Sequence, residues 1–200
     1  MFYLLPKIYK KDNPGRPVVS SVGSHTEKLS AYVDEFLRPL AEKLPSHIKD
    51  TADFITHLKS LGKLPKGCFM VTLDVSSLYT NIDTSEGIRI VREELEETLT
   101  DKPSATTIAT LLEKVLNNNN FTFGDNHYMQ VKGTAMGTRV APNFANSYMG
   151  RVEKQSVYES PWRDQVLDWK RFIDDIFLLW IGDEQSLLNF RESKQSNTIN

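Results

Sequence analysis

Residues 171–181 read RFIDDIFLLWI and place two adjacent acids, Asp174 and Asp175, inside an otherwise almost wholly apolar stretch. Aspartate is a good turn former, so a plain hairpin turn is one interpretation. Such a turn usually brings glycine or asparagine, however, whereas the neighbours here are Ile173 and Ile176. Two adjacent carboxylates also repel each other unless a cation lies between them. The stretch predicts two strands, residues 169–172 and 176–181, around either a simple turn or a cation site.

A third acid has a similar setting. The apolar run CFMVTL at residues 68–73 is of strand length and ends at Asp74, which could also cap whatever follows. Mg²⁺ binds a few carboxylates together with phosphates and water, so two or three acids on neighbouring strands supply its ligands. We therefore expect Asp74, Asp174 and Asp175 to converge, with Asp74 and Asp174 within reach of one cation.

Composition limits the other possibilities. The chain has 200 residues, of which 40% are apolar and 25% charged, as in ordinary globular proteins. No apolar run approaches the ~20 residues that cross a bilayer, so no membrane association is expected. A single cysteine, Cys68, and four scattered histidines favour neither a disulfide framework nor zinc. The net charge of −2 argues mildly against nucleic-acid binding, although residues 1–16 carry four cations against one acid.

Apolar periodicity and turn residues predict the remaining elements. Hairpins are expected over residues 3–20 and 121–131, and helices over 24–44, from Thr51 to Gly62, after Asp83, from Ser104 to the Asn117–Asn120 run, and from about Pro142. Thr51 should cap the second helix, and Pro39 should kink or end the first. Because strands and helices mix without strict alternation, the predicted fold class is α+β, an antiparallel sheet with packed helices.

Three segments resemble reverse transcriptase motifs, in the order in which that family has them. FIDD at 172–175 resembles the [YF]-x-D-D motif, TLDVSSLYTNI at 72–82 the first aspartate motif, and GTAMGTRVAP at 133–142 the glycine-bearing motif between them. With LPKIYK at 5–10 and GRPVVSS at 15–21, the set resembles most closely Penelope-like retroelements, relatives of telomerase. The resemblance runs from about Tyr3 to Ile181.

This resemblance implies a right-hand polymerase fold. Fingers would cover residues 1–64 and the palm residues 65–190, without a thumb. Residues 191–200 are polar and are therefore expected to form a frayed end. The reaction would be nucleotidyl transfer from deoxynucleoside triphosphates to a DNA primer on an RNA template. Asp74 and Asp174 would be the principal ligands of two Mg²⁺ ions, or of Mn²⁺, with Asp175 accessory.

The resemblance also implies nucleotide-binding residues. Lys10 and Arg16 would grip the triphosphate, and Tyr79 would select deoxynucleotides by clashing with a ribose 2′-hydroxyl. Lys132, Gly133 and Gly137 would let the backbone approach template and nucleotide closely, as glycine permits. The simpler interpretations are solvated hairpin charges, a half-buried core tyrosine and a bare turn.

Departures from the family pattern keep other functions open. Asp83 and Tyr9 stand where the family has proline and usually histidine, and the thumb, a palm strand and a GIY-YIG endonuclease are missing. We therefore expect a fragment or decayed copy that binds primer–template poorly. One alternative is an RNA-dependent RNA polymerase, against which Tyr79 argues. Another is a non-catalytic palm-derived fragment that binds nucleic acid, and a two-metal nuclease lacks a further Glu or His arrangement.

Overall fold

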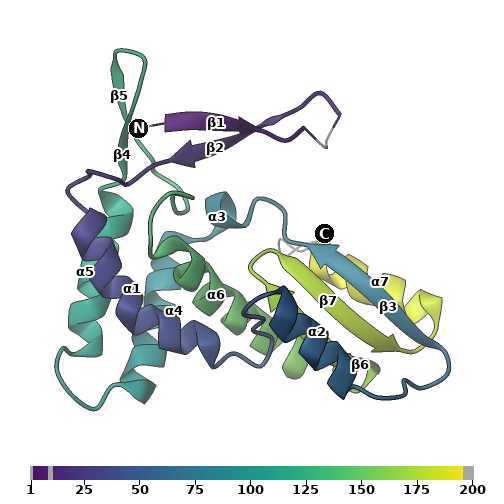
Figure 1. Cartoon of the computed structure of the whole chain (residues 1–200). Coiled ribbons are helices and arrows are strands. Elements are labelled where there is room, and N and C mark those ends of the chain that lie inside the picture. The colour runs from purple at the N-terminus through teal and green to yellow at the C-terminus, as the bar shows by residue number, and fades with distance from the viewer. Residues whose placement is uncertain (1, 9–10, 196–200) are drawn as a thin grey trace. The chain divides into compact units, whose positions relative to one another are not determined.

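The computed structural model describes residues 2–8 and 11–195 and divides the chain into two compact units (Figure 1). Unit 1 comprises residues 1–40 and 79–148, and unit 2 comprises residues 41–78 and 149–200. Both units thus draw on residues from either side of position 64. The division into fingers and palm at that position stays a prediction. Lys10 lies outside the described residues.

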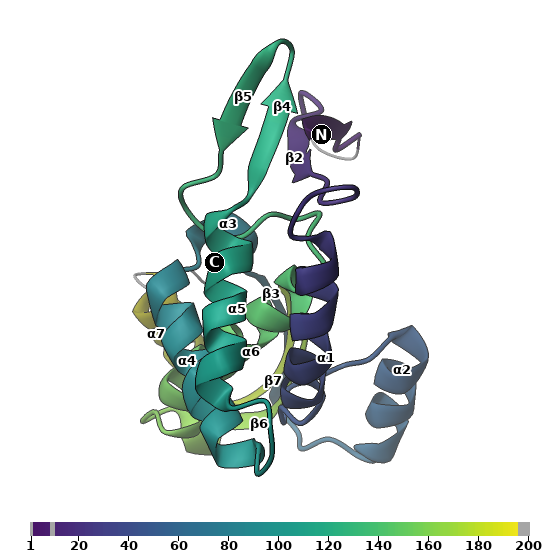
Figure 2. The same ribbon diagram turned by 90° about the vertical axis from the view of Figure 1, so that its left-hand side faces the viewer.

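Unit 1 contains two antiparallel hairpins and a group of helices. The hairpins pair β1 (Phe2–Pro6) with β2 (Gly15–Val19), and β4 (Asn120–Phe123) with β5 (Asn126–Met129). Its helices are most of α1 (Glu27–Glu42), most of α3 (Leu78–Asn81), α4 (Thr84–Thr98), α5 (Ala105–Asn117) and the first part of α6 (Ala141–Glu153). Helices α4 and α5 lie side by side (Figure 2) and bury Ile90, Val91, Leu95, Ile108 and Leu112.

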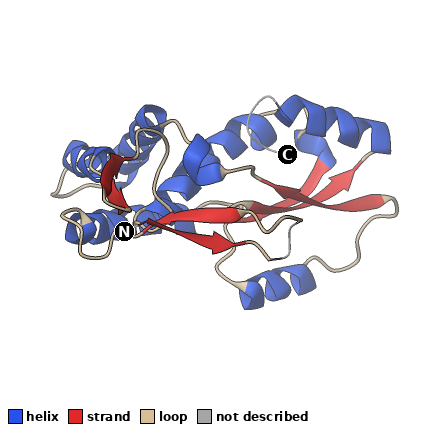
Figure 3. Cartoon of the chain, turned by 90° about the horizontal axis from the view of Figure 1, so that it is seen from above, coloured by secondary structure: helices blue, strands red, loops and turns tan. Residues whose placement is uncertain are grey.

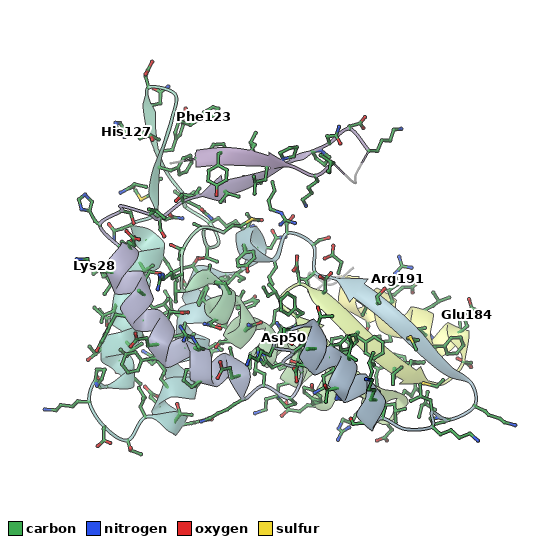
Figure 4. The ribbon with its side chains drawn as sticks, viewed as in Figure 1. Lys28, Asp50, Phe123, His127, Glu184 and Arg191 are labelled. Carbon is green, nitrogen blue, oxygen red and sulfur yellow. The ribbon has the colours of Figure 1, made fainter. Side chains whose placement is uncertain are left out.

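The helix caps mostly follow the predictions. Asp83 caps α4 by accepting a hydrogen bond from the Glu86 N–H at 2.9 Å, and Ser104 caps α5. The prediction for α2 (Thr51–Ser60) is wrong by one residue, because Asp50 is the cap and accepts from the Asp53 N–H at 2.9 Å (Figure 4). Aspartate in the preceding position satisfies the same orphan N–H groups that Thr51 was expected to satisfy.

Pro39 does not end the first helix, because α1 continues to Glu42. Proline removes one backbone hydrogen bond and disfavours a helix interior. Val33 and Leu37 before it and Ala41 after it are each fully buried on α1. Packing of that apolar face outweighs the local preference, as tertiary contacts commonly do.

Unit 2 is built on a three-stranded antiparallel sheet. The strands β3 (Cys68–Asp74), β7 (Asp175–Ile181) and β6 (Val166–Phe172) lie in the order β3-β7-β6. Helix α7 (Glu184–Gln195) covers one face, where the Trp180 and Phe190 ring centroids are 5.0 Å apart. Helix α2 lies on the opposite face, where Phe54 contacts Phe177 with a centroid distance of 5.1 Å (Figure 3). The sequence predicted all three strands but neither α7 nor the short α3.

A π-helical turn (Lys154–Tyr158) extends α6, and a single 3₁₀ turn (Arg163–Gln165) precedes β6. None of the helices in the described part of the chain is both long and apolar enough to span a membrane.

Candidate active site

The paired acids lie at the turn of the β6–β7 hairpin. Phe172 and Asp175 form the last pair of the two strands, so Ile173 and Asp174 make a two-residue loop. Ile173 has φ 56°, in the left-handed region that β-branched side chains rarely adopt. The acids therefore do occupy a hairpin turn, but one whose residues do not favour its backbone conformation.

The sheet places the third acid beside this turn. Asp74 and Asp175 are register partners at the adjoining ends of β3 and β7. Directly opposed residues put their side chains on the same face, with Cβ atoms about 4.5–5.5 Å apart. The Val75 N–H donates to the Asp174 carbonyl at 2.9 Å, which ties the loop to the end of β3. All three acids thus lie at one end of one sheet, while their role as metal ligands stays a prediction.

The electrostatics of this group suit a cation. Partial burial, followed by the negative charges of Asp174 and Asp74, raises the pKa of Asp175. A cation would relieve this repulsion, and carboxylate oxygens are the ligands that Mg²⁺ prefers. Among the residues that the structure describes, no group of three or more Asp, Glu, His or Cys side chains is arranged so that it could hold a metal ion. Mg²⁺ does not require such a group, because one or two carboxylates and substrate phosphates usually hold it.

A cavity of about 600 Å³ opens beside Asp175. Its wall is mostly apolar and includes Phe54 from α2, Phe172 from β6 and Phe177 from β7. Small-molecule sites commonly have this size and a largely apolar lining with a few polar groups. The carboxylate end of the sheet therefore adjoins a space large enough for a small ligand.

The candidate nucleotide-binding residues lie in unit 1, apart from Lys10, which is not described. Arg16 is exposed on β2 opposite Leu5, and Lys132 is exposed after β5. Tyr79 is half-buried in α3. The three carboxylates belong to unit 2. Nucleotide binding by the residues of unit 1 and metal binding by the carboxylates therefore remain two separate predictions.

Within unit 1, Gly133 and Tyr79 do come together. The Thr134 N–H donates to the Tyr79 carbonyl at 2.7 Å, and Gly133 has φ 69°. A Cβ on Gly133 would lie 2.2 Å from that carbonyl oxygen, and one on Gly137 would lie 2.1 Å from the Val19 oxygen. Both glycines therefore permit close packing against the chain's own backbone. Approach to a template or nucleotide stays a prediction.

The sequence analysis missed two buried charges next to the carboxylate turn. Arg171 and Glu153 form an ion pair in which each side chain is 1% exposed. The alternation of side chains along a strand could have indicated that Arg171 is buried. Arg171 lies two residues after Trp169 in β6, so both side chains face the same, buried side of the sheet.

Comparisons with known proteins identify the fold. No model of a protein family and no curated protein sequence matches the chain. Solved structures do match. Telomerase from Candida albicans, in complex with the TWJ fragment of telomeric RNA, matches with a TM-score of 0.70 and 12% identity over 96% of this chain and 40% of that one.

Two other structures give a similar result. Apo telomerase from Candida tropicalis, truncated from its C-terminal domain, matches with a TM-score of 0.67 and 12% identity over 100% of this chain and 48% of that one. The RNA polymerase complex inside a dsRNA virus matches with a TM-score of 0.62 and 11% identity over 98% of this chain and 19% of the other. The chain spans less than half the length of these proteins. It has a mixed helix-and-sheet fold related to those of telomerases and a viral RNA polymerase complex.

Proposed function

We propose that this chain belongs to an RNA-directed DNA polymerase of a Penelope-like retroelement. The observation that carries the proposal is the register pairing of Asp74 with Asp175, with Asp174 tied to Val75 in the adjoining turn. The fold relationship to telomerases, at a TM-score of 0.70, supports it, as does the order of the sequence motifs. In this proposal the sheet of unit 2 belongs to the palm, and the hairpins of unit 1 belong to the fingers.

Asp74 and Asp174 would hold two Mg²⁺ ions, or Mn²⁺, with Asp175 as an accessory ligand. When bound, the ions would supply charge neutralisation at the reacting phosphate and lower the pKa of the primer 3′-hydroxyl. The protein's own contribution is to fix the carboxylates at the ends of paired strands. A bound cation would favour the ionised form of Asp175 and so oppose the rise in its pKa that burial and the neighbouring carboxylates cause.

Residues of unit 1 would bind the incoming nucleotide. Arg16 offers a planar fork to phosphate oxygens, and Lys10 a point charge. Lys132 and Gly133 would approach the template and nucleotide, and Tyr79 would exclude a ribose 2′-hydroxyl. An RNA template paired with a DNA primer would be the macromolecular partner, in keeping with the telomerase structure that contains a telomeric RNA fragment.

The test is addition of one nucleotide to a DNA primer on an RNA template, at high protein concentration, with Mg²⁺ or Mn²⁺. We expect Asp174→Asn to reduce the addition rate at least ~100-fold, because the mutation removes a principal metal ligand. Asp125→Asn, an exposed acid at another hairpin turn, is the matched control and should leave the rate unchanged. Addition that survives both Asp74→Asn and Asp174→Asn would refute the assignment and favour a non-catalytic binding fragment.

The same assay separates DNA from RNA synthesis, the alternative suggested by the likeness to the viral RNA polymerase complex. Tyr79→Val should raise ribonucleotide addition relative to deoxyribonucleotide addition, because a smaller side chain leaves room for the 2′-hydroxyl. Unchanged discrimination would make Tyr79 a packing residue. Preference of the unaltered chain for ribonucleotides would favour the RNA polymerase.

A further inference from the structure

The loop that carries Asp174 needs support from outside itself. A β-branched residue in the left-handed region is uncommon and persists where the surrounding structure imposes it. Ile173 is such a residue. In a two-residue hairpin loop the central carbonyls have no partner within the hairpin ladder, and here both are bound. The Asp174 carbonyl accepts from the Val75 N–H at 2.9 Å, and the Ile173 carbonyl accepts from Arg171 Nη1 at 3.1 Å.

Arg171 is itself fixed by a buried carboxylate. Its Nε donates to Glu153 Oε1 at 2.6 Å, and its Nη2 lies 3.5 Å from Glu153 Oε2. The guanidinium therefore bridges the end of helix α6 and the hairpin loop, with one edge toward each. Arginine's planar fork permits this double use, whereas the single ammonium of lysine could not reach both groups in the same geometry.

Two further donors hold Glu153 in place. The Trp169 indole N–H donates to Oε1 at 3.0 Å, and the Ser46 hydroxyl donates to Oε2 at 2.5 Å. The Ser46 segment also bonds directly to the strand, since the Arg171 N–H donates to the Ser46 carbonyl at 2.7 Å. These contacts connect three separate stretches of unit 2. The Trp169 and Ser46 side chains thus both donate to a carboxylate that is 1% exposed.

We propose that Arg171 is a positioning residue. Anchored on Glu153, it holds the Ile173 carbonyl and thereby keeps the loop that carries Asp174 in its strained conformation beside the end of β3. Its consequence for metal binding rests on the proposed function, but the positioning itself does not. Arg171 touches no substrate in this account and acts only through the backbone of the loop.

The ordinary alternative is that the pair only fills the interior of unit 2. Loss of either partner would then destabilise the whole sheet evenly, because a buried charge without its partner is costly wherever it lies. The positioning role and the purely interior role of the pair predict different hydrogen exchange at one amide. The Val75 N–H, bonded to the Asp174 carbonyl, reports opening of the loop, whereas the Leu178 N–H in the central strand reports opening of the sheet.

The experiment compares hydrogen exchange at these two amides in the whole chain. In Arg171→Lys, which keeps a charge beside Glu153, we expect hydrogen exchange at the Val75 amide to become at least ~10-fold faster relative to exchange at the Leu178 amide. This ratio separates local opening of the loop from global opening of the sheet. Ser46→Ala is the matched control. It removes a hydrogen bond from the same carboxylate without touching the loop, and should leave the ratio within about 3-fold of the unaltered chain. An unchanged ratio in Arg171→Lys would overturn the proposal.

A further variant, Ile173→Gly, covers the case in which Arg171→Lys does not fold. With Arg171 present, Ile173→Gly should retain slow exchange at Val75, since the guanidinium still holds the loop carbonyl. Fast exchange in Ile173→Gly would show that the isoleucine side chain, not Arg171, fixes the loop.

Mn²⁺ binding, measured by calorimetry with a deoxynucleoside triphosphate present, tests the consequence for the site. Residues that support metal ligands typically affect metal affinity by ~10–100-fold, and we expect a decrease of that size in Arg171→Lys but not in Ser46→Ala. If the unaltered chain binds no Mn²⁺, the proposed function fails, while the exchange ratio still decides whether Arg171 positions the loop. Unchanged Mn²⁺ affinity beside a changed exchange ratio would reject the link to metal binding alone.

Discussion

In the described part of the chain, two hairpins have two-residue loops whose second residue is aspartate, and the two loops are supported in different ways. In the β4–β5 hairpin of unit 1 the loop is Gly124–Asp125, and in the β6–β7 hairpin of unit 2 it is Ile173–Asp174. The first loop residue is left-handed in both, with φ 60° at Gly124 and φ 56° at Ile173. Glycine adopts that conformation without steric penalty, whereas isoleucine does not.

The difference shows which of the two turns is determined by its own residues alone. The β4–β5 hairpin is largely exposed, and a Cβ on Gly124 would meet no atom within 4 Å. Its turn chemistry alone accounts for its shape. The β6–β7 hairpin has a buried central strand, and Arg171 and Val75 bind both of its loop carbonyls. Side-chain and backbone contacts from outside the loop therefore support this turn, as surrounding structure commonly does for strained conformations.

The largest expected loss of stability comes from removing Glu153, the carboxylate that holds Arg171 beside the β6–β7 loop. Glu153→Ala would leave the buried Arg171 charge without its partner, which typically destabilises a protein by about 3–5 kcal/mol. The three tryptophans, Trp162, Trp169 and Trp180, all lie in unit 2, so their fluorescence during urea unfolding measures the loss.

The control for this prediction is an exposed ion pair on α4. Arg89 binds Glu86 and Glu93 there, and Arg89→Gln should hardly move the unfolding midpoint, because solvent screens exposed pairs. Equal destabilisation by Glu153→Ala and Arg89→Gln would show that burial of the Arg171–Glu153 pair is energetically unimportant.

A smaller loss of stability is expected when the β4–β5 loop receives isoleucine, the residue that the β6–β7 loop has at the same position. Gly124→Ile places a β-branched residue at φ 60°, with no counterpart of Arg171 to hold it. The left-handed conformation costs a non-glycine residue about 1–2 kcal/mol, and the open space around Gly124 means that no steric clash adds to this. Thermal unfolding followed by circular dichroism would measure it. Gly124→Asn should cost less, because asparagine tolerates this region, and equal stability of Gly124→Ile and the unaltered chain would remove the contrast.

Aromatic contacts give the β4–β5 hairpin a modest additional support. Phe121 stacks on Tyr128 with a centroid distance of 5.5 Å and lies 5.4 Å from Phe2 of β1. Phe121→Leu keeps apolar bulk but removes the ring contacts, which are worth about 0.5–1.5 kcal/mol. Faster hydrogen exchange in residues 120–129 would register the loss. No change in that segment would mean that turn chemistry holds the hairpin by itself.

The same contrast explains how far the sequence could be interpreted. Features that act through neighbours in the chain predicted their elements correctly. They are Gly124, the Asp83 and Ser104 caps and the apolar runs at 68–73 and 176–181. Pro39 does not end the first helix and Thr51 does not cap the second, because each is outweighed by something slightly further away, the buried face of α1 and the Asp50 side chain.

The support of the carboxylate turn could not be predicted in this way. Arg171 pairs with a residue 18 positions away, and Ser46 donates to that residue from 107 positions away. Strand alternation could have placed Arg171 on the buried face beside Trp169, but nothing local identifies Glu153 as its partner. Ile173 gave a partial signal: its unsuitability for a turn was noticed in the sequence, and the structure shows what compensates for it.

The smallest expected effect is a pH dependence that distinguishes the acids of the two hairpins. Burial, with the charges of Asp174 and Asp74, raises the pKa of Asp175 in the folded chain. An acid whose pKa is raised on folding stabilises the fold when protonated, so this contribution is complete below the unfolded-state pKa and is lost as pH rises through the folded-state pKa. Asp175→Asn should therefore be more stable than the unaltered chain at neutral pH, and the two should converge as the pH falls through that window.

Thermal unfolding of both proteins at a series of values between pH 3 and pH 8 measures this difference. Asp125→Asn, on the exposed local hairpin, is the control, and its difference from the unaltered chain should not follow the same curve. Mg²⁺ should reduce the neutral-pH advantage of Asp175→Asn, because a cation among the three carboxylates offsets their repulsion. If Asp175→Asn were instead less stable at neutral pH without metal, neither burial nor the charges of Asp174 and Asp74 would destabilise the ionised Asp175 carboxylate, and the case for a cation beside it would lose its electrostatic basis.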